Sequence, residues 1–356
     1  MILQFRFLAL ALIASLLSSC FKKDDPVVLP PPGDVQVSQV SMGPDYYNQI
    51  YFQLSTKNIK ESDHRFWDLA FESSSSGYHV WVNGGNQILV SNTNSSDFTH
   101  VTDTIFASWK WDASSWNPDS TAIGDWTHFV PTNPTNTKYG VAYSNPGKNE
   151  ETEDLQTGTT VYILDLGTDA TASERFKKIV FETVSATQYT FRYANLDGTN
   201  QHEILLQKNS AFAYKYFSIR NGDTEVFPEP VKSDWDIQFT RYRYIFYQSG
   251  QVIPYLVSGV LVNPDGYSVA VDTTKSFSDI DYNFAKDLVF INSALHRDVI
   301  GWNWKHFNFS TSIYEVNSSK NYIIKDKIGY YWKLHFIGFY NDQGVKGYPQ
   351  FEFQRL

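Results

Sequence analysis

A single cysteine, Cys20, stands at the end of an apolar run, where a thiol can become acylated. Residues 7–17 are apolar apart from Ser15, and Leu17-Ser18-Ser19 leads into the cysteine as a lipobox-like sequence. About a dozen apolar residues are too few to span a bilayer and suit a secretory leader. Several acyl chains on such a cysteine would anchor the chain stably. The alternative is an ordinary signal peptide with a chance cysteine.

The residues around Cys20 therefore predict a signal peptide at 1–19 and a lipidated, proline-rich tether at 20–37. The segment Phe21-Lys22-Lys23-Asp24-Asp25 resembles the sorting signal that sends lipoproteins of some Gram-negative bacteria to the outer face of the outer membrane. Proline-rich tethers stay extended. We expect an outer-membrane lipoprotein exposed at the cell surface, with membrane lipid as a partner through Cys20.

Two carboxylates, Asp68 and Asp236, each follow a tryptophan in a similar local sequence. Paired carboxylates can hydrolyse glycosides. Each Asp, however, lies on the strand face opposite its tryptophan, and the two come from different halves of the chain. We therefore expect them to cap turns or accept backbone N–H bonds. The sequence holds no G-x-S-x-G, H-E-x-x-H or Walker motif, so no catalytic residue is assigned and no enzyme activity is expected.

Histidines recur next to tryptophans. On a strand, Trp302, Trp304 and His306 would point to one face, and Trp126 with His128 repeats this pattern in the first half. An imidazole beside an aromatic wall could ligate the iron of a porphyrin. The other interpretation is that each histidine packs in an aromatic layer and bonds a carbonyl. One cysteine allows neither a disulfide framework nor a thiolate metal site.

Charge and composition narrow the class of protein. Loss of residues 1–19 removes only Arg6, which changes the net charge from −9 to about −10. An acidic chain of this kind disfavours nucleic acid as a partner. The aromatic content of 17%, with many Thr, Ser and Val, is typical of a sheet protein.

The chain contains an internal duplication, because four pairs of similar segments occur in the same order in both halves. The pairs are 51–54 with 216–219, 66–71 with 234–239, 123–129 with 300–307, and the closing strands in 176–193 with those in 332–353. These pairs predict two units, 38–200 and 201–356. Convergent strand patterns are the alternative.

Hydrophobic residues alternate with period two, which is typical of half-buried strands. On this basis Trp67, Leu69 and Phe71 share one face. Helical periodicity is weak and is confined to short stretches near 171–175 and 280–287. We predict a mainly β fold: two tandem antiparallel β units with minor short helices.

The segments 216–223 and 234–242, together with the ending 331–336 and 347–353, resemble the HmuY family of surface haem-binding lipoproteins. The resemblance covers residues 201–356 well and residues 35–198 more loosely, as a degenerate second copy. It implies a mainly β fold and a haemophore role without catalysis. In that role the protein takes haem from host carriers and passes it to an outer-membrane receptor. Family members are typically one unit long, so the duplication departs from the pattern.

The resemblance also implies where haem iron, the only expected metal, would be ligated. A family histidine falls close to His306, and His296 is the nearest candidate for a second one. The internal repeat adds His128, and Trp302, Trp304 and Trp126 are the candidate pocket aromatics. Met42 is the only methionine after the leader, which excludes a pair of methionine ligands.

A second class of function stays open, namely a glycan- or peptide-binding accessory lipoprotein of an outer-membrane uptake system. Exposed tryptophans can stack on sugar rings, and loops often carry binding residues. The first half is rich in tryptophans: Trp81, Trp109, Trp111, Trp116 and Trp126. These rings could instead cover a sheet edge. A third class is a spacer or adhesive role.

Overall fold

The structure, a computed structural model, describes residues 31–130, 155–167, 170–171 and 174–356. The predicted signal peptide, Cys20 and most of the predicted tether lie outside the described residues. In the described part every strand pairing is antiparallel, and the predicted mainly β fold is confirmed.

Four larger sheets build the fold. Sheet A has the order β1 (Gln36–Gln39), β23 (Lys346–Arg355), β22 (Tyr331–Tyr340), β21 (Asn321–Lys325), β17 (Ser268–Asp272) and β18 (Ile291–Asn292). Sheet B has the order β16 (Gln251–Val262), β15 (Ile237–Gln248), β2 (Asn48–Phe52) and β3 (Ile59–Asp63). Sheet C has the order β14 (Thr224–Val226), β13 (Tyr214–Ser218), β4 (Leu69–Glu72) and β5 (Val80–Val82).

Sheet D is the largest. It has the order β12 (His202–Gln207), β11 (Gln188–Asn195), β10 (Phe176–Val184), β8 (Leu155–Thr157) and β7 (His128–Val130), and β9 (Val161–Asp165) joins β10 to β6 (Leu89–Ser95). A separate two-stranded hairpin consists of β19 (Lys305–Asn308) and β20 (Ile313–Val316).

Helical structure is sparse. The 3-10 turns are η2 (His64–Phe66), η3 (Gly84–Asn86), η4 (Pro118–Ser120) and η5 (Phe277–Asp279). The short helix expected near 280–287 is confirmed as α2 (Tyr282–Ala285), where the Asp281 carboxylate accepts the backbone N–H of Phe284 as an N-cap. The other expected helix, near 171–175, falls partly on residues outside the description.

Two apolar cores lie between pairs of sheets. The C-terminal core fills the space between sheets A and B, with Phe52, Phe239 and Phe336 among its members. The N-terminal core lies between sheets C and D and includes Phe71 and Phe191. Aromatic rings on the remaining face of sheet C form a third cluster, called here the tryptophan layer: Trp67, Trp81, Trp116, Tyr214 and Tyr216.

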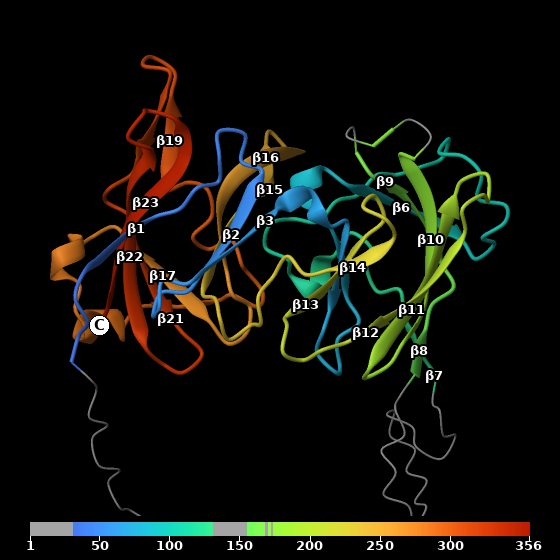
Figure 1. The fold of residues 1–356 in the computed structure, drawn as a ribbon, viewed down its shortest axis with the longest axis horizontal. Coiled ribbons are helices and arrows are strands. Elements are labelled where there is room, and N and C mark those ends of the chain that lie inside the picture. The colour runs from blue at the N-terminus through green and yellow to red at the C-terminus, as the bar shows by residue number, and fades with distance from the viewer. Residues whose placement is uncertain (1–30, 131–154, 168–169, 172–173) are drawn as a thin grey trace, which may run out of the picture. The chain divides into compact units, whose positions relative to one another are not determined.

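Each core takes strands from both halves of the sequence. In sheet B, β2 pairs with β15, so that Phe52 faces Ile237. In sheet C, β13 pairs with β4, so that Phe217 faces Leu69. The first strand β1 also lies beside the last strand β23 (Figure 1). In the repeated pattern, β2 and β4 of the first half correspond to β13 and β15 of the second half. Each half therefore gives one strand to a pair with the other half: β2 pairs with β15, and β13 pairs with β4.

Because strands of the two halves pair with each other, the predicted boundary near residue 200 does not separate the two cores. Asn195 and Thr199 are bonded across the turn that joins β11 to β12 within sheet D. A cut at that place would separate β12 and β13 from the N-terminal core to which they contribute Leu206 and Phe217. The division into units 38–200 and 201–356 stays a prediction about the sequence repeat.

The expected face shared by Trp67, Leu69 and Phe71 is wrong. Leu69 and Phe71 lie in the N-terminal core, whereas Trp67 packs in the tryptophan layer with Ala70. The reason is that β4 begins only at Leu69, so the period-two alternation does not extend back to Trp67.

Candidate functional site

A groove of about 370 Å³ lies between the β15–β16 ribbon and the β19–β20 hairpin, a volume within the range of small-molecule sites. Its walls are mostly aromatic, and its polar groups are mostly basic. The lining residues are Tyr46, Arg241, Phe246, Tyr255, Leu256, Val257, Ser258, Trp302, Lys305, His306, Phe307 and Tyr314. An aromatic groove with cationic groups suits a flat, apolar ligand that carries negative charge.

Gly301 sets the direction of the chain that enters this groove. Its backbone bonds Val260 of β16 in both directions, at 2.9 and 3.0 Å. Its φ is +66°, and a Cβ there would meet the Asp298 carbonyl oxygen at 2.8 Å, so only glycine fits without strain. The next residue, Trp302, then packs edge-on against Tyr244 and Phe246 of β15.

Lys305 supplies a buried amine at the groove. Its Nζ donates to the Ser258 carbonyl oxygen at 2.6 Å and lies 4.4 Å from the centre of the Trp304 ring. Burial lowers the pKa of this amine to about 7, because the charged form loses its hydration. An anionic ligand in the groove would favour the protonated amine.

His306 lies on β19 with its side chain 60% exposed. Its Nε2 is 3.3 Å from the carboxylate of Glu315, the residue opposite it on β20. The imidazole therefore stands at the groove with one nitrogen near a carboxylate, which can orient the ring toward a ligand.

The structure brings two of the predicted site residues together, because Trp302 and His306 both line the groove. Trp304 does not line it; it lies in the C-terminal core, stacked on Phe336 at 3.9 Å. Since β19 begins at Lys305, the alternation expected from Trp304 to His306 is interrupted. Trp304 is therefore buried, whereas His306 is exposed to solvent.

The other predicted histidines lie elsewhere. His296 is exposed in the turn after β18, and His128 is exposed at the start of β7; neither lines the groove. Trp126 lies in the N-terminal core and donates its indole N–H to the Tyr78 carbonyl oxygen at 2.9 Å. His306 is the only histidine among the groove's lining residues.

Most of the residues that line the groove were not among the candidates predicted from the sequence. Tyr46, Arg241 and Tyr255 come from segments that only tertiary pairing brings next to the β19–β20 hairpin. A local signal did exist, because aromatic residues continue at 242, 244, 246 and 247, past the end of the β2 pairing at Phe239. Aromatic residues beyond the last paired position indicate that this end of β15 packs against a segment outside sheet B, here the one that contains Trp302.

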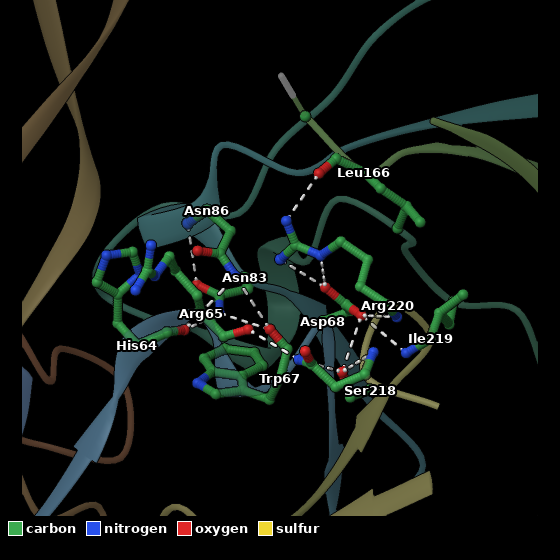
Figure 2. Close-up of polar contacts among 12 residues, drawn as sticks. His64, Arg65, Trp67, Asp68, Asn83, Asn86, Leu166, Ser218, Ile219 and Arg220 are labelled. Atoms are coloured by element: carbon green, nitrogen blue, oxygen red, sulfur yellow. Dashed lines mark hydrogen bonds and ion pairs between the residues drawn. The ribbon is translucent and has the colours of Figure 1, made fainter. Parts of the chain in front are cut away.

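The Asp68 carboxylate sits in a dense network of donors (Figure 2). It accepts the backbone N–H of Ile219 at 2.8 Å and of Arg220 at 3.0 Å, and it accepts the Arg220 Nε at 2.7 Å. Arg220 also donates to the Leu166 carbonyl oxygen. The expectation that this carboxylate accepts backbone N–H bonds is confirmed.

Asp236 occupies the equivalent place in the second repeat. Its carboxylate accepts the backbone N–H of Leu54 and the hydroxyl of Tyr267, both at 2.5 Å. The following asparagines match too, since Asn83 and Asn263 donate to the carbonyl oxygens of Trp67 and Trp235 at 2.8 and 2.7 Å. Both carboxylates are committed to holding strands together.

A second groove, of about 290 Å³, lies beside β6 in the first half. The hydroxyl-bearing residues Ser91, Thr93 and Ser95 line it, and so does Phe106, which is 95% exposed. The tryptophans considered for sugar stacking are mostly elsewhere, because Trp81, Trp116 and Trp126 are buried.

Among the residues that the structure describes, no group of three or more His, Cys, Asp or Glu side chains lies close enough to hold a metal ion. No helix in the described ranges has the length and apolar character to cross a membrane.

Comparison with known proteins bears on the second half of the chain. The family model described as HmuY protein matches residues 210–353, which confirms the resemblance seen over 201–356. The matched segment contains β13 and β14 of sheet C, β15 and β16 of sheet B, and β17, β18, β21, β22 and most of β23 of sheet A. No curated protein matches the chain.

Solved structures are similar only at low identity. Apo PinO from Porphyromonas gingivitis is 9% identical with a TM-score of 0.28, covering 91% of this chain and 97% of its own. An HmuY-like protein from Bacteroides vulgatus ATCC 8482 is 10% identical with a TM-score of 0.21, covering 94% and 95%. The apo HmuY analogue of Tannerella forsythia is 8% identical with a TM-score of 0.20, covering 92% and 98%. These TM-scores are low, so the similarity to the HmuY family is limited to the match over residues 210–353.

Proposed function

We propose that this protein captures haem without catalysis, as an HmuY-type lipoprotein, and that the groove between β15–β16 and β19–β20 is the binding site. One observation carries the proposal: Trp302, Lys305 and His306 line the same aromatic groove. Haem needs apolar walls for the ring, a nitrogen or sulfur ligand for iron, and cations near its carboxylates.

Each of these needs has a candidate in the groove. Trp302, Phe246 and Tyr255 offer ring surfaces. The imidazole of His306 is exposed enough to reach iron. Lys305 and Arg241 are cationic groups that a propionate could approach, and Arg241 donates to the Asp45 carbonyl oxygen at 3.4 Å. The residues therefore fit haem as a ligand held by one histidine.

The proposed site offers one histidine to the haem iron, whereas the resemblance implied two protein ligands. His296, the nearest sequence candidate for a second histidine, does not line the groove, and Met42 is buried in the C-terminal core. Among the groove residues, only the Tyr46, Tyr255 and Tyr314 hydroxyls could add a further protein ligand for iron beside His306.

Anchoring and transfer belong to the same proposal. Lipid attached to Cys20 would hold the protein at the cell surface, and the proline-rich tether would separate the domain from the membrane. An outer-membrane receptor would then receive the haem. Labelling with radioactive palmitate checks the anchor, since Cys20→Ala should lose the label.

A titration with ferric haem tests the ligand. We expect a shifted Soret band for the wild-type protein and at least tenfold weaker binding for His306→Ala. His296→Ala and His128→Ala are matched controls, because both remove an exposed histidine outside the groove. No spectral shift at micromolar haem, or equal losses in all three variants, would contradict the proposal.

Glycan binding is the second candidate, and the groove beside β6 favours it. Its hydroxyl groups and the exposed Phe106 ring match the donors, acceptors and stacking surface that a sugar needs. A glycan array with wild type and Phe106→Ala checks this function. Signals that Phe106→Ala leaves unchanged would count against this groove.

A further inference from the structure

The strand β16 is an edge of sheet B, and β15 is the only strand that pairs with it in the described part of the chain. The register with β15 runs without a shift from the pair Ile237–Val262 to the pair Gln248–Gln251. In such an antiparallel pair every second residue bonds the neighbouring strand, and the residues between them direct their backbone groups away from it. This second set decides what the free edge of β16 can bind.

Two residues identify the set that points away from β15. Val260 exchanges both of its backbone bonds with Gly301, at 2.9 and 3.0 Å, so it does not bond β15. Pro254, six positions earlier, belongs to the same set, which agrees with its lack of an N–H for β15. Leu256 and Ser258 lie between these two residues at even spacing and therefore also point to the open edge.

The chain itself closes one end of the space beside this edge, called here the lane. Gly301 fills the lane beside Val260, and the Lys305 Nζ donates to the outward carbonyl oxygen of Ser258 at 2.6 Å. Toward the turn between β15 and β16, no strand or isolated bridge of the described residues pairs with the outer side of β16. The lane is thus closed at Ser258 and open at the other end.

The side chains of β16 favour an apolar peptide in the lane. Residues 251–262 carry no charged side chain, and Val252 and Tyr255 are 52% and 61% exposed. A long uncharged edge attracts other strands unless it is protected, and here one proline interrupts the row of donors. Backbone bonds to such an edge supply affinity when an extended segment is added as a further strand.

Charge and shape indicate which part of a partner chain fits the closed end. Among the described residues, the groove beside the lane is lined by Arg241, Lys305 and His306 and by no Asp or Glu. A segment that continued past Ser258 would collide with Gly301, so the partner chain must end there. A terminal carboxylate meets both conditions, whereas a terminal amine would meet like charge.

We propose that β16 binds the C-terminal segment of a partner protein as an added parallel strand, with the terminal carboxylate beside Lys305. The backbone of Leu256 donates one bond and accepts another, and the carbonyl oxygen of Pro254 accepts a third. Leu256 also lines the proposed haem groove, so haem and the segment would exclude each other. The proposal itself does not depend on haem binding.

A peptide library tests the proposal with the full mature chain in the absence of haem. Randomised hexapeptides with a free C-terminal carboxylate are equilibrated with the immobilised protein, and the retained peptides are sequenced and titrated. We expect enrichment of apolar C-terminal sequences and at least tenfold weaker binding of the same peptides as C-terminal amides. No enrichment, or equal binding of the amides, would overturn the proposal.

The variants Leu256→Pro and Leu256→Ala separate backbone pairing from side-chain contact. Both remove the leucine side chain, but only proline removes the outward N–H, and Pro254 already occupies the same side of β16. We expect an enriched peptide to bind Leu256→Pro at least tenfold more weakly than Leu256→Ala. If Leu256→Pro does not fold, backbone N-methylation of the peptide should cause a comparable loss with the wild-type protein. Equal affinities in either comparison would contradict strand addition.

Lys305→Met tests the position of the carboxylate. The variant should bind the free acid and the amide of an enriched peptide equally, whereas a retained preference for the acid would contradict the role of Lys305. Sedimentation of the peptide-free protein examines the other occupant of an open edge. A dimer that Leu256→Pro abolishes would identify a second copy of this chain in the lane and would overturn the proposal.

Discussion

The carboxylate of Asp68 accepts the backbone N–H of Ile219 at 2.8 Å, across 151 positions of sequence. The repeat has the reciprocal bond, from the backbone N–H of Leu54 to Asp236 at 2.5 Å. Each aspartate thus holds the end of a strand that comes from the other half of the chain. In both copies of the Trp-Asp segment, the aspartate carboxylate accepts a backbone N–H from the other half of the chain, and these two bonds join the halves.

Replacing Asp68 by Asn should destabilise the protein by roughly 3 kcal/mol, because it removes the charge that pairs with the largely buried Arg220 and puts an amide N–H against backbone donors. Urea unfolding followed by tryptophan fluorescence measures the change. Asp97→Asn is the control, since the exposed Asp97 carboxylate also accepts backbone N–H bonds, from Thr99 and His100, and contacts the exposed His100 ring, so its loss should have little effect. Equal midpoints for the two variants would contradict the role of Asp68.

Dividing the chain at residue 200 should produce two fragments that do not fold alone. Fragment 33–200 lacks β13, which pairs with β4, and fragment 201–356 lacks β2, which pairs with β15. Mixing the two should restore a one-to-one complex with native circular dichroism. A cooperative unfolding transition in either fragment alone would show that the halves are independent units.

Glu229→Gln should stabilise the protein at pH 8 by roughly 3 kcal/mol at most. Burial raises the pKa of this carboxyl to about 7 in the folded state, against 4.5 when unfolded. The folded state therefore binds more protons between these values, and stability falls as pH rises from 4.5 through 7.

The glutamine variant lacks this loss, and its amide can still bond the Tyr216 hydroxyl, which donates to Glu229 at 2.6 Å. Unfolding free energies at pH 5 and pH 8 measure the difference. Glu203→Gln, an exposed position on β12, serves as the control. A wild-type curve with the same pH slope as Glu229→Gln would refute the buried-carboxyl account.

Lys305→Met should flatten the rise of stability between pH 7 and about pH 10. Burial lowers the folded pKa of this amine from 10.5 to about 7, so the unfolded state binds more protons across that window and stability increases with pH. The variant should also bind haem more weakly below pH 7, where the wild-type amine is protonated. Lys286→Met, an exposed lysine paired with Asp287, should change neither property.

Much of the local structure could be predicted from the sequence. Period-two alternation indicates strands such as β22 and β23, and the short helix α2 lies within its expected stretch. The sequence also predicted that Asp68 and Asp236 accept backbone N–H bonds. Each aspartate lies next to the start of a strand, and no catalytic partner residue was found for either one.

Side-chain directions near strand ends could not be predicted in this way. Alternation holds only while a strand is continuous, and both β4 and β19 begin after the tryptophan from which the pattern was counted. Trp67 and Trp304 consequently lie in clusters that the pattern did not indicate. Closeness in sequence also did not predict which histidines lie together. His306 and His296 are ten residues apart, but only His306 lines the groove.

The sequence by itself indicated the strand segments and predicted their recurrence in two halves, and its resemblance to the HmuY family agrees with the family model that matches residues 210–353. Only the tertiary structure decided which strands pair, and with them the groove and the exchange of β2 and β13 between the halves. The physical reason is that hydrogen bonds between strands are not local. Alternation specifies which side of a strand is buried, whereas the partner strand is selected by packing across the whole chain.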